Sequence, residues 1–429
     1  MNKYRSPSAP RTAEDVPYPP TPENTLRGGK FEGIDTEVEP RSTRAAKCVG
    51  VAALYVTLYG GSFLGSDISQ GIKEGKERVA HDHAQVHTVH EYESDDSPFD
   101  VHATVVLTGL GTKDATGTAE TLEAHRSVGS VYAVEYGNKD LNTKDIAERI
   151  LEQAQEDDIS YLSLDGYSMG GPIALDVAIH IQQSESDVDV VSVILNSSPI
   201  GEGGLTERSA QSIHVMERIL ALHKDLVYYE NGRVAIELAA RSEHYLQEVG
   251  HDDTRGLKVH SMQEYSYDGT RYRLDLESLR HELSEITRKL QQPNIANANL
   301  IQNQASILKL DFEEKIQTLH EDTLVVYTRS DSSSGDTVVD VEASEHNIVS
   351  TLKEHAQPYK ILRAHVQHAN PAERREEYDR MIRGKIQPEV IYYLQEQTAP
   401  APLVRSDRPI TEDVAALGSL ETKKIPKIN

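Results

Sequence analysis

Short runs of β-branched and apolar residues alternate with helical segments from residue 101 onward, and this alternation restricts the possible folds more than any other feature of the chain. Runs of this kind, separated by helix-length segments such as 143–156 and 171–183, are typical of parallel strands joined by crossover helices. We therefore expect an α/β fold with a mostly parallel sheet flanked by helices. The predicted strands span residues 101–109, 130–137, 159–166, 188–196, 323–328 and 359–364.

The alternation is regular up to residue 200 and is then interrupted until residue 322. Residues 201–322, called the insertion below, separate two strands of one expected sheet. The apolar residues of segment 274–291 follow a spacing of three and four, which places them on one face of a helix. We expect the insertion to be mostly helical, with helices at residues 208–226, 233–249, 274–291 and 295–320.

The two ends of the chain lack the pattern of a folded domain. Residues 1–44 are rich in Pro, Ser, Thr and charged residues, and Pro17–Pro22 favours extended polyproline II structure. Residues 396–429 show no sustained periodicity. We expect a disordered tail at the first end and a flexible tail at the second.

An uncharged stretch, CVGVAALYVTLYGGSFLG, covers residues 48–65 and follows Arg41, Arg44 and Lys47. Its length is near the lower limit of about 17 residues for a membrane helix. We interpret it as a single-pass, uncleaved signal anchor, with the basic residues in the cytoplasm and the chain after Asp67 on the extracytoplasmic side. The alternative is a buried helix of a soluble cytoplasmic protein.

Charge and cysteine content exclude several classes of protein. The chain has 69 acidic and 44 basic side chains, a net charge of −25, which repels nucleic acid, so we expect no nucleic-acid partner. The only cysteine is Cys48. The chain therefore has no intrachain disulfide, no cysteine-based zinc cluster and no thiol nucleophile outside that position.

One motif in the sequence indicates a chemical activity. The predicted strand 159–166 continues directly into GYSMGG (166–171), and a helical segment begins at once. A serine hydroxyl is a weak nucleophile, so it must be raised clear of the sheet and lie near a base and near donors for an oxyanion. A sharp turn between glycines achieves this for Ser168, and it directs the backbone N–H of Met169 toward the developing oxyanion.

In this strand–turn–helix context, GYSMGG resembles the nucleophile elbow of the α/β-hydrolase superfamily, which includes lipases, esterases and thioesterases. The resemblance implies an α/β-hydrolase core at 80–200 and 323–385 and a helical lid at 201–322. It also implies a serine hydrolase without a cofactor or metal, which cleaves an ester, thioester or amide of a small or lipid-like acyl substrate through an acyl-enzyme. The alternatives are acyl transfer or other chemistry on the same triad, or a noncatalytic, membrane-attached protein of the same fold.

The superfamily places its triad in the order Ser, acid, His, with the acid after a late strand. The segment after strand 323–328 contains Asp331, Asp336 and Asp340, and Asp336 with its following Thr-Val-Val is similar to the family's acid. We assign Asp336 as the acid, with Asp331 as the competitor. Asp340 is better explained as the N-cap of a helix starting at residue 341. The glycine and glutamate positions of a calcium loop do not match this segment.

The last predicted strand is followed by His365-Val-Gln-His368-Ala-Asn370-Pro371. Asn370 suits an N-cap and Pro371 suits the first helical position, so His368 is expected on the loop between strand and helix. His365 is expected to be still in the strand. We therefore predict His368 as the catalytic base.

The loop after the first core strand reads Thr108-Gly-Leu-Gly and is expected to supply the second oxyanion donor, the N–H of Leu110. Many relatives have His-Gly at this turn, and Thr108 departs from that pattern. The same loop does not match the dinucleotide-binding motif GxGxxG, because that motif requires a glycine at the position of Asp114.

Overall fold

The computed structural model describes much of residues 83–398, together with residues 73, 74, 76 and 77. The predicted N-terminal tail and the predicted membrane helix at 48–65 lie outside the described residues, as does the chain beyond residue 398. Among the helices that are described, none has the length and apolar character needed to cross a membrane. Within 83–398, the structure does not describe residues 93–96, 98, 139, 208, 211–212, 215–216, 218–232, 235–236, 239–240, 242–243, 252, 254–256, 262–263, 268–269, 291, 293, 332–335, 365–367, 369–370 and 372–373.

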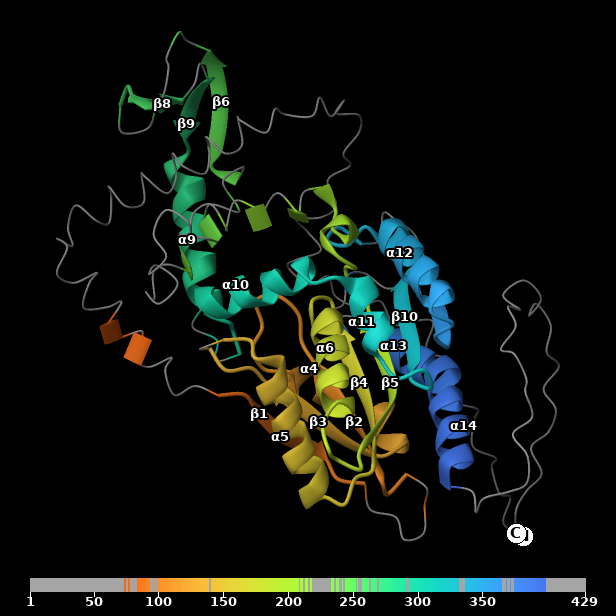
Figure 1. The fold of residues 1–429 in the computed structure, drawn as a ribbon. Helices are drawn as coiled ribbons and strands as arrows, with labels where there is room; N and C mark the ends of the chain where they lie inside the picture. The colour runs from red at the N-terminus through yellow and green to blue at the C-terminus, as the bar shows by residue number, and fades with distance from the viewer. Residues whose placement is uncertain are drawn as a thin grey trace, which may run out of the picture. The chain divides into compact units, whose positions relative to one another are not determined.

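Seven strands form the main sheet in the order β1-β3-β2-β4-β5-β10-β11 (Figure 1). Neighbouring strands are parallel except for β1, which pairs antiparallel with β3. The predicted strands are confirmed with small differences at their ends, whereas β1 was not predicted. The strands are β1 (Gln85–His90), β2 (His102–Leu107), β3 (Ser130–Glu135), β4 (Tyr161–Tyr167), β5 (Asp189–Asn196), β10 (Leu324–Ser330) and β11 (Tyr359–Ala364).

Apolar side chains on both faces of the sheet are buried by helices. Along β2, Val105 and Leu107 belong to one apolar cluster and Val106 to another, as expected from the alternation of side chains along a strand. The first cluster is completed by α5 (Thr143–Glu156), α6 (Gly170–Gln182) and α12 (Val341–Glu354). The second is completed by α4 (Thr116–Thr121), α13 (Arg375–Met381), a π-helical turn (Ile382–Ile386) and α14 (Gln387–Thr398).

Three predicted helix starts agree with the structure to within one residue, and one differs. The predicted helices at 143–156 and 171–183 are present, and Asp340 caps α12 as predicted, accepting a hydrogen bond from the N–H of Ala343. The helix predicted to begin at Pro371 begins instead at Arg375, since Pro371 lies in a turn closed by the Arg374 N–H. α14 reaches Thr398 and so extends past residue 396, where a flexible tail was expected.

The insertion contains a second sheet that was not predicted (Figure 1). Its four antiparallel strands have the order β6-β9-β8-β7, so the end of the predicted helix 233–249 is wrong where β6 lies. In β9 the side chains of Tyr272 and Leu274 are buried and Arg273 is exposed, and the buried pair packs with Ile286. The strands are β6 (Leu246–His251), β7 (Leu257–Val259), β8 (Glu264–Tyr267) and β9 (Thr270–Leu274).

Three helices follow this small sheet in the chain. α9 (Leu276–Leu290) confirms the helix predicted from three- and four-residue spacing. The single helix predicted over 295–320 is instead divided into α10 (Ala298–Ser306), a short 3-10 turn and α11 (Phe312–Thr318). The break falls at Asp311, whose side chain accepts hydrogen bonds from the first backbone N–H groups of α11 and so starts a new helix.

Candidate active site

Ser168 occupies the sharp turn between strand β4, which ends at Tyr167, and helix α6, which begins at Gly170. Its φ is +53°, a left-handed conformation that is rare for a residue with a side chain. The backbone N–H of Ser168 donates to the carbonyl of Asn196 at 2.8 Å, and the carbonyl of Ser168 accepts from Gly171 at 3.0 Å. The turn therefore holds a strained serine in place at the end of a buried strand.

Glycines around the serine are required by close packing of strand and helix. A Cβ added at Gly166 would lie 2.2 Å from the carbonyl oxygen of Gly170, and one added at Gly170 would lie 2.4 Å from the carbonyl oxygen of Leu107. Both distances are far shorter than a nonbonded contact permits. The glycine pattern that predicted the elbow thus has a direct steric cause.

The structure brings together the three residues predicted as a triad. The Nε2 atom of His368 lies 2.9 Å from the Oγ of Ser168, and its Nδ1 atom lies 3.0 Å from the Oδ2 of Asp336. Because a carboxylate only accepts hydrogen bonds, Nδ1 carries the proton and Nε2 accepts from the serine hydroxyl. The Asp336 side chain is fully buried, whereas that of His368 is 23% exposed and faces the site.

The carboxylate of Asp336 is fixed by its own loop. Its Oδ1 accepts hydrogen bonds from the N–H groups of Val338 and Val339, both at 2.9 Å, which leaves Oδ2 for His368. This local turn explains why the aspartate points toward the histidine. The competing Asp331 is exposed at the end of β10, and His365, the competing histidine, lies outside the described residues.

The loop that contains Leu110 passes directly over the turn at Ser168. A Cβ added at Gly109 would lie 2.8 Å from the Cβ of Ser168 and 3.2 Å from the backbone nitrogen of Met169. Within the described part of the chain, the N–H groups of Met169 and Leu110 donate no hydrogen bond. Both predicted donors therefore lie beside the serine, and their N–H groups donate no hydrogen bond to another described residue.

Sequence reasoning missed a buried polar network beneath the turn. The side chain of Asn196 bridges Asp165 and Thr328 by hydrogen bonds, and the other carboxylate oxygen of Asp165 lies 2.8 Å from the Nε2 of His125. Since the Asn196 carbonyl holds the Ser168 N–H, the network ties the serine to β5 and β10. Asn196 ends a predicted strand, but nothing local in the sequence indicates these partners, which come from distant segments.

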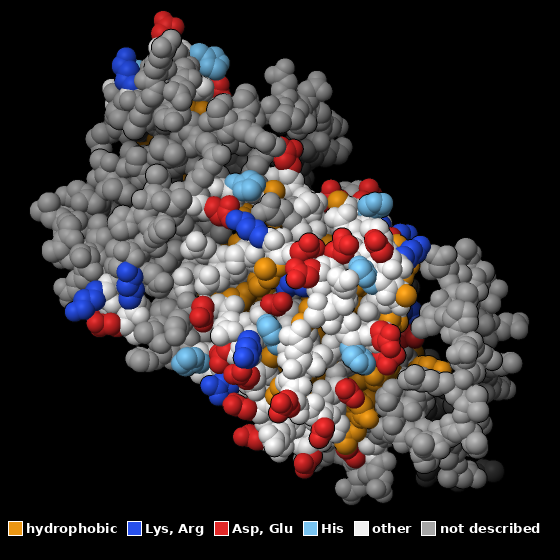
Figure 2. Space-filling model, in the orientation of Figure 1, with side chains coloured by type: hydrophobic (Ala, Val, Ile, Leu, Met, Phe, Trp, Pro, Cys, Tyr) orange, Lys and Arg blue, Asp and Glu red, His pale blue; other side chains and the backbone are white. Residues whose placement is uncertain are grey.

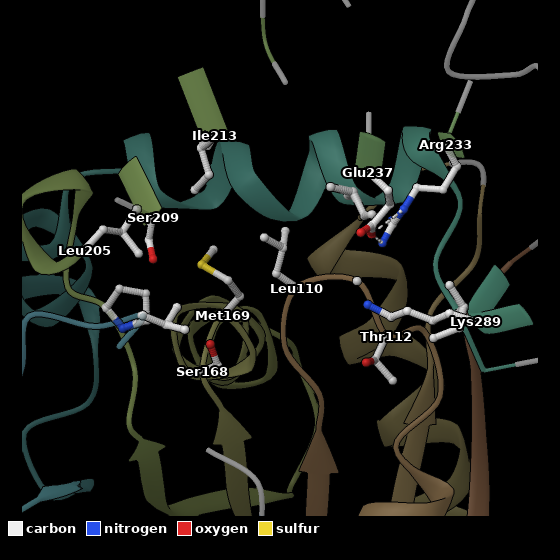
Figure 3. Close-up of a pocket in the computed structure, with 15 residues that line it drawn as sticks. Leu110, Thr112, Ser168, Met169, Leu205, Ser209, Ile213, Arg233, Glu237 and Lys289 are labelled. Carbon is white, nitrogen blue, oxygen red and sulfur yellow. Dashed lines mark hydrogen bonds and ion pairs between the residues drawn. The ribbon is translucent and has the colours of Figure 1, made fainter. Parts of the chain in front are cut away.

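A cavity of about 290 Å³ opens above Ser168 and is lined by Met169 and Leu110 as well (Figure 3). Apolar side chains, including Leu205 and Ile213, lie on one side of the view, and Arg233, Glu237 and Lys289 lie on the other. The charged residues were not predicted, because they belong to the insertion and only the fold brings them to the cavity. Among the described residues, no group of His, Cys, Asp and Glu is arranged to hold a metal ion.

The chain has the α/β-hydrolase fold. A mostly parallel sheet with one antiparallel strand at the first edge and helices on both faces carries a strained serine between β4 and α6. Asp336 follows β10 and His368 follows β11, which matches the order of acid and histidine in the triad of this fold. The fold follows from these features of the chain itself.

No family model and no curated protein matches the sequence. Solved structures that the chain resembles include an esterase from Exiguobacterium antarcticum, with 14% identity, a TM-score of 0.39 and coverage of 73% of this chain and 94% of the esterase. An enol-lactonase from Burkholderia xenovorans has 12% identity, a TM-score of 0.42 and coverage of 72% and 96%. The homoserine O-acetyltransferase from Bacillus anthracis has 12% identity, a TM-score of 0.43 and coverage of 65% and 87%. At such low identities and TM-scores, these likenesses carry no argument about what this chain does.

Proposed function

We propose that this chain is a serine hydrolase that cleaves an ester, thioester or amide of a small acyl substrate. The observation that carries the proposal is the His368 ring, which is hydrogen-bonded to the Ser168 hydroxyl through Nε2 and to the buried Asp336 carboxylate through Nδ1. This is the arrangement that activates a serine nucleophile. The cavity above Ser168 gives a small substrate access to it.

In the proposed reaction, the Ser168 Oγ attacks the substrate carbonyl carbon while its proton passes to Nε2 of His368. Asp336 holds the ring in the required tautomer and stabilises the imidazolium that forms. When the tetrahedral intermediate collapses, the leaving group takes the proton from Nε2 and the acyl group stays on Ser168. Water then attacks the acyl-enzyme, with His368 again accepting the proton and returning it to Ser168.

The tetrahedral oxyanion needs donors that are in place before the reaction begins. We assign this role to the N–H groups of Met169 and Leu110, which lie beside Ser168 and donate no hydrogen bond to another described residue. Met169 is buried at the start of α6, and Leu110 is partly exposed on the loop above it. Two donors on separate segments allow the oxyanion to be held from two sides.

A direct test measures nitrophenol release from a series of short-chain nitrophenyl esters. The intact chain should turn over at least one ester, and Ser168→Ala should reduce kcat by several orders of magnitude. Equal rates for the intact chain and the Ser168→Ala variant would refute the proposal. Product analysis in the presence of competing alcohols or amines distinguishes hydrolysis from acyl transfer.

A further inference from the structure

Lys289 places a positive charge at the cavity, and no carboxylate in the described part of the chain forms an ion pair with it. It lies in the last turn of α9, its side chain is partly buried, and it lines the cavity that opens above Ser168. In Figure 3 its amino group points inward, toward the space between Leu110 and Glu237. The side chain of Lys289 forms no hydrogen bond or ion pair with any part of the chain that the structure describes, and its charge acts on Glu237 only over a longer distance.

Among the described residues that line the cavity, the only carboxylate is that of Glu237, and it is already paired with two arginines. The Oε1 atom of Glu237 accepts from Nη2 of Arg233 at 2.5 Å and from its Nε at 3.1 Å, while Oε2 lies 3.4 Å from Nη2 of Arg241. Burial opposes ionisation of Glu237, but the charges of Arg233 and Lys289 outweigh it and hold the pKa of Glu237 below its ordinary value. Lys289 therefore stabilises Glu237 from a distance without being neutralised by a contact.

The charge balance of the cavity is opposite to that of the chain. Among the described residues that line it, Arg233 and Lys289 are positive and Glu237 is negative, whereas the whole chain has a net charge of −25. Figure 2 shows acidic side chains spread over the described part of one face of the molecule. The Lys289 side chain lines the cavity and has no ion-pair partner among the described residues, so its charge is available to an anionic group of a ligand.

We propose that Lys289 binds an anionic group of the substrate, such as a carboxylate, while the scissile carbonyl lies at Ser168. This inference rests on the proposed function, because it assumes that the cavity holds the substrate of Ser168. Apolar Leu205 and Ile213 line the opposite side of the cavity, with Met169 and Leu110 between the two sides (Figure 3). The substrate class is thus a small ester, thioester or amide with an apolar part on one side of the scissile bond and an acidic group on the other.

The test uses two covalent probes, so that it does not depend on knowing the substrate. One is a fluorophosphonate whose short alkyl tail ends in a carboxylate, and the other is its methyl ester, both made in a series of tail lengths. The rate of labelling of Ser168 is measured for each probe, and the ratio of the two rates is compared between variants. Any general effect of a variant on the serine changes both rates and cancels in the ratio.

For the intact chain, the carboxylate probe of the matching length should label Ser168 about 10- to 100-fold faster than its methyl ester, the range expected for a hydrogen bond to a charged group. In Lys289→Met the ratio should fall to about one, and Lys289→Arg should retain most of it. Arg280→Met is the matched control, because it removes an exposed cation from the same helix and should leave the ratio unchanged. Thermal unfolding of each variant checks that the fold is intact.

Failure of this inference differs from failure of the proposed function. Equal labelling of Ser168 by both probes at every tail length, or a carboxylate preference that survives in Lys289→Met, would overturn the role of Lys289 and leave Ser168 as the nucleophile. If neither probe labels Ser168, the proposed function fails and the inference fails with it.

Discussion

The side chain of Gln304 holds the loop above Ser168 through three hydrogen bonds. Its Oε1 accepts from the Gly111 N–H at 3.0 Å, and its Nε2 donates to the carbonyls of Gly109 at 3.2 Å and Thr112 at 3.0 Å. Gln304 is fully buried in α10, far from this loop in the sequence. One residue of the insertion therefore fixes the backbone that presents the Leu110 N–H.

We expect Gln304→Leu to reduce kcat more than it changes KM, because the loop would lose its position relative to the oxyanion. The loss in kcat should be about tenfold or more, and the unsatisfied loop groups should lower the free energy of unfolding by about 1–3 kcal/mol. Gln302→Leu, at an exposed position of the same helix, is the control. An unchanged kcat in a folded Gln304→Leu protein would show that the loop is not positioned in this way.

Asp336 and Asp331 were competing candidates for the acid, and their variants should behave differently. Asp336→Asn replaces the acceptor of the His368 Nδ1 proton and favours the wrong tautomer, so kcat should fall on the order of 10³- to 10⁴-fold. Asp331→Asn, at an exposed position, should change kcat by less than about threefold. Steady-state kinetics on one ester compare the two variants. A larger loss in Asp331→Asn would reverse the assignment.

The strands and the proximity of Ser168, Asp336 and His368 could be predicted because their sequence signals are local. Each core strand is a short β-branched run, the elbow has its glycines in order, and Asp336 and His368 follow strands at the expected positions. β1 was missed because it is an edge strand with the polar sequence QVHTVH and little apolar alternation.

The second sheet has one local signal in the sequence. β8 ends at Tyr267 and β9 begins at Thr270, and the sequence between them is Asp268-Gly269, a pair typical of tight hairpins. Alternation of buried and exposed residues in β9 supports the same structure. The roles of Gln304 and Lys289, in contrast, depend on how the insertion folds over the elbow, which no local pattern encodes.

Burial of His102 should make the fold sensitive to acid. Its Nδ1 donates to the Val128 carbonyl at 2.6 Å and its Nε2 accepts from the Ser163 hydroxyl at 2.9 Å, which fits a neutral ring. Burial lowers the pKa of His102 from 6.5 to about 4. Between these values the unfolded chain binds a proton that the folded chain does not, so stability falls as the pH drops below 6.5 and this loss levels off near pH 4.

The full loss of unfolding free energy that results from the lowered pKa of His102 amounts to about 3 kcal/mol. Denaturant unfolding of the intact chain and of His102→Gln should therefore show a smaller loss of stability between pH 7 and pH 4 in the variant. His346→Gln, at an exposed position, is the control and should keep the pH dependence of the intact chain. Identical pH dependence in the intact chain and His102→Gln would contradict the account.

Residues 48–65 remain predicted to anchor the chain in a membrane. We expect the full chain to stay with the membrane fraction during alkaline carbonate extraction, because an apolar helix in the bilayer is not released by breaking ionic contacts. A chain that begins at Asp67 should be recovered in the soluble fraction. Complete release of the full chain into the soluble fraction would contradict the prediction of a membrane helix at residues 48–65.

The most direct measurement of the central claim is covalent labelling with a fluorophosphonate, followed by peptide mapping. In the intact chain the label should be found on Ser168, and Ser168→Ala should abolish labelling. Ser209→Ala is the matched control, because Ser209 lines the same cavity but its hydroxyl is hydrogen-bonded to Thr206, and this variant should still be labelled. Labelling of Ser168→Ala at the rate of the intact chain would contradict the assignment of Ser168 as the nucleophile.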